Sequence, residues 1–154
     1  MIRIGILGAA KIGPKAIIHP AANRKDCDIV AVAARDGDKA RAYAAEHGIA
    51  HVETDYEALV RRNDLDLIYN ALPPHRHADL TIAALEAGKA VLCEKPFAMN
   101  SELHKIGLDH KAIGQLLPSI SVYMDEQHGL VGFGHLGDLI GSDLDAIAAA
   151  AAAA

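Results

Sequence analysis

A short apolar strand runs directly into a glycine-containing turn over residues 2–13. Residues 3–7 are too few and too rich in β-branched side chains for a helix, so they predict a strand that ends at Gly8. Gly8 and Gly13 occupy the first and third positions of a G-x-G-x-x-G pattern, with Ala10 at the second. Such a turn aims the backbone N–H groups of the next helix at a pyrophosphate. The stretch predicts a dinucleotide-binding turn, although glycines at a strand end also occur where no ligand binds.

Short strands rich in Val, Ile and Leu alternate with alanine-rich helical segments after this turn. Parallel strands joined by short loops and helices need right-handed crossovers, so the alternation predicts an α/β fold, a doubly wound parallel sheet of the Rossmann type. The composition agrees, because 51% of the residues are hydrophobic but only 4% are aromatic. We expect strands at residues 28–34, 50–52, 65–72 and 90–93, and helices at residues 12–23, 39–47, 54–62 and 76–87.

Residues that start and stop helices support these boundaries. Pro14 is compatible with a first helical turn, whereas Pro20 is expected to end or kink the first helix. Asp36 or Asp38 is expected to cap the second helix. Residues 54–57 read as a capping box for the third helix. Further stop signals are Gly48 and Gly88 after helices and the Pro73–Pro74 pair after a strand.

The character of the sequence changes after Pro96. Residues 100–110 predict another helix that Asn100 or Ser101 caps, and residues 119–124 alternate like a strand that could extend the sheet. Seven alanines end the sequence, and we interpret them as an unassigned or artificial segment. The expected organisation is a dinucleotide-binding domain at 1–118, the beginning of an incomplete second α+β domain at 119–147, and an alanine tail at 148–154.

Charge and cysteine content narrow the choice of partners and compartment. The net charge of −5 gives no reason to expect a nucleic acid or an anionic membrane surface as partner. Apart from the terminal alanines, no apolar run approaches the roughly 18 residues of a spanning helix. Cys27 and Cys93 form no C-x-x-C motif, so we expect buried, inert thiols in a reducing compartment, the cytoplasm.

The end of the second strand bears on the type of dinucleotide. NAD-binding domains usually place an acidic residue there to accept a hydrogen bond from the ribose 2′-OH. Here Ala34 holds that position and Arg35 follows, and a guanidinium can pair with a 2′-phosphate. Asp36 could restore some NAD preference, and Arg35 could also be an ordinary surface cation. The residues therefore favour NADP modestly over NAD.

A charged cluster, Glu94-Lys95-Pro96, follows the last strand of the predicted sheet. Ligands of open α/β sheets bind just outside the carboxyl ends of the strands. A lysine presented there can donate to a substrate hydroxyl and assist its deprotonation. By position alone, Lys95 could equally be a surface lysine at a strand end.

Four short segments, 8–13, 33–36, 72–77 and 94–96, occur in the order and at the distances typical of one protein family. Together they resemble the glucose–fructose oxidoreductase/inositol dehydrogenase family (Gfo/Idh/MocA). The resemblance covers residues 1 to about 100, and residues 134–138 are similar to the segment that opens the family's second, substrate-binding domain. It implies an NAD(P)-dependent oxidoreductase that oxidises a sugar, cyclitol or diol hydroxyl, or reduces the corresponding carbonyl. Residues 72–77 have the sequence Leu-Pro-Pro-His-Arg-His.

The resemblance also implies roles for individual residues. His77 is the least certain of them, since a histidine early in a helix is often a cap or packing group. The pair His75 and His77 lacks an evident third ligand, so we expect no metal site. By position, Gly8, Ala10, Lys11, Ile12 and Gly13 would cradle the pyrophosphate, Arg35 the 2′-phosphate, Leu72, Pro73 and His77 the nicotinamide side, and Glu94 and Lys95 the reacting centre, with Lys95 as the catalytic residue.

The sequence departs from the family pattern after about residue 100. Family members exceed 300 residues, and their second domain supplies an Asp and a His for proton transfer; none of Asp125, His128, His135 and Asp138 lies in a matching motif. Dinucleotide binding by these residues is expected, and efficient turnover is not. A small sugar-like or polyol substrate is the expected partner, with a homo-oligomer where the second domain is complete. The alternatives are a non-catalytic dinucleotide-sensing module and, less favoured by Arg35, an S-adenosylmethionine-dependent methyltransferase.

Overall fold

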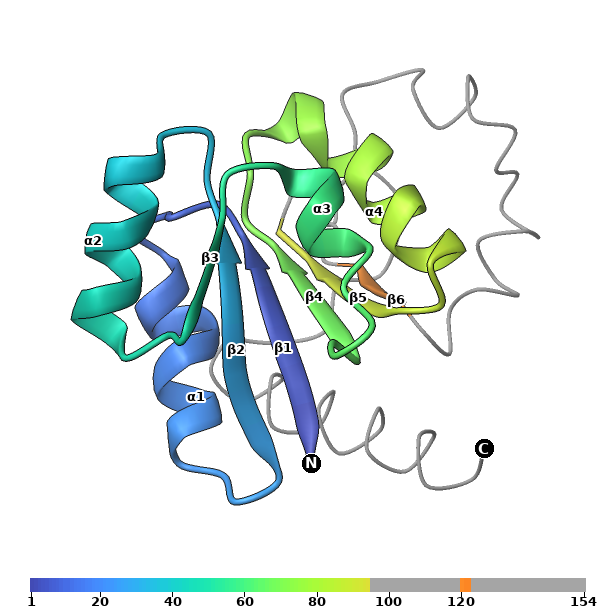
Figure 1. Ribbon diagram of the computed structural model, residues 1–154. Helices are drawn as coiled ribbons and strands as arrows, with labels where there is room; N and C mark the ends of the chain where they lie inside the picture. Colours follow the sequence, from blue (N-terminus) through green and yellow to red (C-terminus); the bar gives the residue numbers. More distant parts are fainter. Residues whose placement is uncertain (95–119, 123–154) are drawn as a thin grey trace, which may run out of the picture.

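Six parallel strands form one sheet, and helices cover both of its faces (Figure 1). The computed structural model describes residues 1–94 and 120–122. The strands are β1 (Ile2–Leu7), β2 (Cys27–Ala33), β3 (His51–Glu53), β4 (Leu67–Asn70), β5 (Ala90–Cys93) and β6 (Ile120–Val122). Their order is β3-β2-β1-β4-β5-β6, and it reverses between β1 and β4 as in a doubly wound Rossmann-type sheet. The predicted fold class is confirmed.

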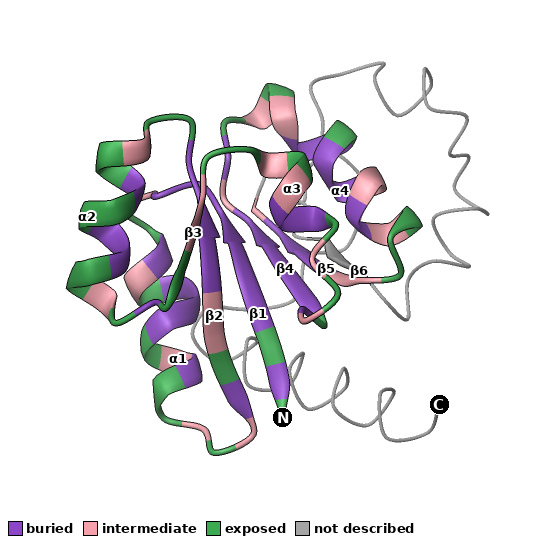
Figure 2. Ribbon diagram, viewed as in Figure 1, coloured by how far each residue is buried: buried purple, intermediate pink, exposed green. Residues whose placement is uncertain are grey.

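The helices form two layers around the sheet (Figure 1). One layer contains η1 (Pro14–Ile18), α1 (His19–Ala22) and α2 (Gly37–His47), and the other contains α3 (Tyr56–Val60), η2 (Pro74–Arg76) and α4 (His77–Glu86). Neighbouring residues of a strand point to opposite faces, so Ile6 belongs to the apolar cluster under α1 and α2, whereas Leu7 belongs to the cluster under α3 and α4. Figure 2 shows that β1, β4 and β5 are buried over most of their length and that β2 is buried over its last three residues. Both faces of the sheet are therefore core.

The first helix continues through Pro20 to Ala22, although Pro20 was expected to end or kink it. Pro20 has no N–H to donate to the Ala16 carbonyl, so a regular α-turn loses a hydrogen bond at this point. The backbone just before it forms wider π-type turns, in which the His19 N–H donates to the Pro14 carbonyl. The proline thus coincides with a change from π to α hydrogen bonding and not with the end of the helix.

Aspartates cap the second and third helices. The Asp36 Oδ1 atom accepts hydrogen bonds from the N–H groups of Asp38 and Lys39 at 3.0 and 3.1 Å, which settles the choice between Asp36 and Asp38. Asp55, and not Thr54, caps α3 by accepting from the Glu57 N–H at 3.0 Å. The Asp55 carboxylate reaches the N–H two residues ahead, and the helix accordingly begins one residue after it.

Some boundaries differ from the predicted ones. Strand β4 covers Leu67–Asn70 within the predicted 65–72, because the Leu72 N–H bonds back to the Asn70 side chain at 3.3 Å and the chain turns before the prolines. Gly48 ends α2 with a φ of +70°, as expected. The strand predicted at 119–124 is confirmed as β6, which pairs in parallel with β5.

Several predicted features lie outside the described residues. They include the helix at 100–110, the segment 134–138 and the alanine tail at 148–154. In the described part of the chain, no helix has the length and apolar character needed to cross a membrane.

Candidate functional site

The carboxyl ends of β1, β2, β4 and β5 meet at one edge of the sheet, which we call the ligand edge. Backbone hydrogen bonds join these ends beyond the strands themselves. The Gly8 N–H donates to the Ala33 carbonyl at 2.8 Å, and the Ala71 N–H donates to the Leu7 carbonyl at 2.9 Å. The Glu94 N–H completes the series by donating to the Asn70 carbonyl at 2.9 Å. Because open α/β sheets bind ligands at such an edge, beside the point where the strand order reverses, this is the candidate site.

The turn after β1 favours glycine at two positions. Gly8 has a φ of +99°, and a Cβ there would lie 3.0 Å from the Ala71 carbonyl oxygen. Gly13 has an ordinary helical backbone, but a Cβ there would overlap the hydroxyl oxygen of Tyr43. One glycine is needed for its backbone angle and the other for space, since an added methyl group would displace a neighbour.

Tyr43 supports this turn from α2, a role that was not predicted from the sequence. Its hydroxyl donates to the Ala10 carbonyl at 3.3 Å. Burial, followed by the charge of Glu46, raises the pKa of Tyr43 to about 12, so the hydroxyl stays protonated at neutral pH and can donate. Its signal in the sequence was a lone tyrosine in an alanine-rich helix. The turn after β1 is thus stabilised by the Tyr43 phenol, which belongs to α2.

The middle of the turn is accessible to a ligand. Lys11 and Ile12 are exposed, with 38% of Ile12 accessible to solvent, and Ala10 is half-buried. An isoleucine so exposed at the start of a helix leaves apolar surface available for contact. Contact of Ala10, Lys11 and Ile12 with a pyrophosphate stays a prediction.

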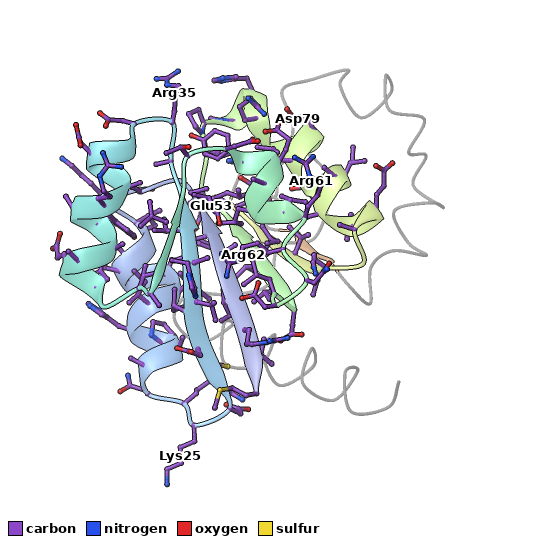
Figure 3. The ribbon with its side chains drawn as sticks, in the orientation of Figure 1. Lys25, Arg35, Glu53, Arg61, Arg62 and Asp79 are labelled. Atoms are coloured by element: carbon purple, nitrogen blue, oxygen red, sulfur yellow. The ribbon has the colours of Figure 1, made fainter. Side chains whose placement is uncertain are left out.

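At the end of β2, the Arg35 side chain extends from the ligand edge into solvent (Figure 3). Its backbone N–H donates to the Tyr56 hydroxyl at 3.0 Å, which ties the end of β2 to α3. The neighbouring Asp36 carboxylate is engaged in capping α2. A second guanidinium, that of Arg41, lies beside Gly37 and pairs with Asp38 at 2.6 Å. Two arginines therefore flank the start of α2, of which only Arg35 was predicted to contact the dinucleotide.

A fully buried asparagine shapes the turn after β4. The Asn70 Nδ2 group donates to the His77 carbonyl at 3.1 Å and to Thr81 Oγ1 at 3.2 Å, while its Oδ1 atom accepts from the Leu72 N–H. The His77 Nε2 atom is hydrogen-bonded to the Leu72 carbonyl. Since a carbonyl oxygen can only accept, Nε2 carries the proton and donates. His77 is 1% exposed and Leu72 is buried, whereas Pro73 is exposed. His77 is thus placed to hold the turn, and its direct contact with a nicotinamide stays a prediction.

Replacing Asn70 with alanine is expected to lower the free energy of unfolding by about 2 kcal/mol, because several buried polar groups lose their partner at once. Urea unfolding followed by circular dichroism measures this. Thr81→Val, which removes one of the partners, is the matched control and is expected to cost about 1 kcal/mol. Equal stability of Asn70→Ala and the wild type would show that the turn does not depend on this side chain.

The end of β5 carries Glu94 beside two buried groups. The hydroxyl of Tyr69, which is 1% exposed, donates to Glu94 Oε1. Burial, and next the hydrogen bond to Glu94, raises the pKa of Tyr69, so it remains a phenol. Burial also raises the pKa of the Cys93 thiol to about 12, and this thiol donates to the Glu94 carbonyl at 3.4 Å. Cys93 and Cys27 are both buried and free of disulfides, as predicted.

The structure brings the predicted site residues at positions 8–13, 35, 72–77 and 94 to one edge of the sheet. Lys95, the predicted catalytic residue, lies outside the described residues. Within residues 1–94 and 120–122, no group of three or more His, Cys, Asp or Glu side chains is arranged to hold a metal ion.

The sequence of this chain is similar to those of known proteins. A family described as "Oxidoreductase family, NAD-binding Rossmann fold" (GFO_IDH_MocA) matches residues 2–108. D-xylose 1-dehydrogenase (NADP(+)) 2 of Haloferax volcanii is 43% identical over 98 residues, which are 64% of this chain and 30% of that protein. The chain thus spans about a third of the length of the curated relatives it matches.

Solved structures of similar proteins agree with the fold. Myo-inositol 2-dehydrogenase from Lactobacillus plantarum has a TM-score of 0.65 at 26% identity, over 77% of this chain and 34% of its own. A 3-ketoreductase from Actinomadura kijaniata, in complex with NADP and TDP-benzene, has a TM-score of 0.60 at 27% identity, over 75% of this chain and 42% of its own. Because the family match covers more than half of its residues, the chain belongs to the Gfo/Idh/MocA family of oxidoreductases.

Proposed function

We propose that this chain provides the dinucleotide-binding domain of an NAD(P)-dependent oxidoreductase that acts on a sugar, cyclitol or diol hydroxyl or on the corresponding carbonyl. The observation that carries the proposal is the turn after β1, where Gly8 and Gly13 leave no room for a side chain at the ligand edge. The relatives support the substrate class, since their names include a D-xylose dehydrogenase and a scyllo-inositol dehydrogenase.

The residues at the ligand edge fit a dinucleotide. Gly8 permits the tight turn after β1 and Gly13 permits close packing against Tyr43, which are the roles of the first and third glycines of a dinucleotide-binding turn, and Ala10 holds the position nearest the pyrophosphate. Residues 8–13 would hold the pyrophosphate, Pro73 and Leu72 would line the nicotinamide side, and Glu94 would accept hydrogen bonds beside it. A bound nicotinamide supplies hydride transfer to or from carbon. Lys95 would donate a hydrogen bond to the substrate oxygen and assist movement of its proton.

NADP is the dinucleotide we favour, with NAD as the alternative. Arg35 extends from the end of β2, and Arg41 lies beside Gly37, so two guanidinium groups flank the place where a 2′-phosphate would bind. Asp36, the residue that could favour NAD, caps α2 through Oδ1. Names of similar proteins include NADP or NADP(+) and also NADH, so the preference rests on the two arginines.

Arg35→Ala is the experiment that tests the proposal. Titration of the full chain with NADPH and NADH, followed by nicotinamide fluorescence, gives the two dissociation constants. We expect the Kd for NADPH to rise about tenfold to a hundredfold and that for NADH to change less than about twofold, because only NADPH loses a charge-assisted hydrogen bond.

Lys25→Ala is the matched control, since Lys25 lies at the opposite end of the domain (Figure 3) and its loss removes the same charge. An equal loss of NADPH affinity in both variants would reduce Arg35 to a general electrostatic role. A wild-type chain that binds neither dinucleotide would contradict the proposed function.

The organisation of the whole protein is part of the proposal. We place a substrate domain after the Rossmann domain, and because β6 (Ile120–Val122) lies in the Rossmann sheet, we move the boundary from the expected residue 118 to a position beyond β6. We also propose that two copies of the protein pair through this substrate domain and that the protein is cytoplasmic.

A further inference from the structure

Tyr69 and Glu94 come from different strands but meet on one face of the sheet. Tyr69 lies opposite Leu92 in the register of β4 and β5, and both side chains belong to the apolar cluster under α1 and α2. Glu94 follows Leu92 by two residues, so it points to the same side where β5 ends. A tyrosine in the middle of β4 therefore reaches the carboxylate at the ligand edge.

The contact gives the buried Tyr69 hydroxyl an acceptor and orients the half-buried Glu94 carboxylate. Tyr69 is 1% exposed, and a phenol so deeply buried needs an acceptor, which Glu94 Oε1 provides. Glu94 itself is half-buried at the ligand edge. A carboxylate has two oxygens, so the bond to Tyr69 uses one and leaves the other to accept from a ligand.

The backbone of Glu94 is held as well. Its N–H donates to the Asn70 carbonyl at 2.9 Å, and its carbonyl accepts from the Cys93 thiol at 3.4 Å. Because backbone and side chain are both fixed, the carboxylate has little freedom left to lose when a ligand binds. Pre-organisation of this kind increases affinity.

We propose that Tyr69 is a positioning residue, which holds the Glu94 carboxylate ready to accept a hydrogen bond from a ribose hydroxyl of the bound dinucleotide. The inference rests on the proposed function and extends it to a residue buried beneath the site. If Tyr69 were only a packing residue, removal of its hydroxyl would leave binding unchanged, because phenylalanine fills the same space.

A double-mutant cycle tests this. Tyr69→Phe, Glu94→Ala and the double variant are made in the full chain, and the Kd for NADPH is measured by fluorescence titration. We expect each single variant to raise the Kd about tenfold, and the double variant to match Glu94→Ala alone, because Tyr69 acts through Glu94. Effects that multiply to about a hundredfold would overturn the positioning role.

Tyr43→Phe is the matched control, since Tyr43 is another buried phenol but bonds to the Ala10 carbonyl and not to Glu94. Its effect is expected to multiply with that of Glu94→Ala. Thermal unfolding of every variant checks that the fold is retained. Tight NADPH binding by both wild type and Tyr69→Phe would overturn the inference alone, whereas a wild type that binds no dinucleotide would overturn the proposed function and this role together.

Discussion

Gly13→Ala is expected to lower the free energy of unfolding by about 2 kcal/mol and to weaken dinucleotide binding. The added Cβ would overlap the Tyr43 hydroxyl oxygen, and Tyr43 is buried between α2 and the sheet. Overpacking in a well-packed core forces side chains and backbone to move. Movement of Tyr43 would also break its bond to the Ala10 carbonyl and distort the turn. Urea unfolding and NADPH titration measure the two effects.

Tyr43→Phe provides the rescue for this prediction. Removal of the hydroxyl takes away the overlapping atom, because the ring carbon that carried it would be 3.5 Å from the new Cβ, an ordinary contact. Tyr43→Phe alone is expected to cost about 1 kcal/mol for the lost hydrogen bond. The double variant Gly13→Ala/Tyr43→Phe is expected to be more stable than Gly13→Ala. A double variant that is less stable than either single one would show that the glycine is needed for another reason.

Lys95→Ala is expected to lower kcat of the complete protein by about a hundredfold to ten-thousandfold, the range typical of general acid–base groups. The Kd for NADPH is expected to change less than about threefold, since the lysine is proposed to contact the substrate oxygen and not the dinucleotide. A lysine that bound the dinucleotide would change the Kd as well as kcat. Steady-state oxidation of a panel of sugars, cyclitols and diols, followed by nicotinamide absorbance, gives kcat. Fluorescence titration gives the affinity.

Lys39→Ala controls for the loss of a positive charge, because Lys39 is an exposed residue of α2 and carries no proposed catalytic role. It is expected to leave kcat within about twofold of the wild type, as surface substitutions usually do. An unchanged kcat in Lys95→Ala would remove this lysine from the mechanism. A parallel loss of kcat and of dinucleotide affinity would place it in cofactor binding.

Local patterns predicted the parts of the fold that depend on local forces. Short apolar runs separated by alanine-rich segments predicted the order of the described elements, because strands buried on both faces are apolar throughout and helices are longer and partly polar. Gly8 and Gly48 were identified as turn residues, and both have positive φ angles. The ligand edge followed from the same reasoning, since parallel strands end together.

Contacts between residues far apart in the sequence could not be predicted from local patterns. Gly13 is required because Tyr43, thirty residues later, occupies the space beside it, and no local pattern encodes that overlap. The Tyr69 hydroxyl finds Glu94 across 25 residues, because β4 and β5 become neighbours only in the folded sheet. Such partners are set by which elements pack together.

The sequence by itself determined the α/β class, the glycine turn after the first strand and the arginine at the end of the second, since each depends on residues close together in the chain. The tertiary structure decided which polar groups support the site. Asn70 is a strand residue with no sequence motif, yet its burial beside α4 makes it the support of the following turn. A buried polar group must find its partners in space, and those partners belong to whichever element the fold brings next to it.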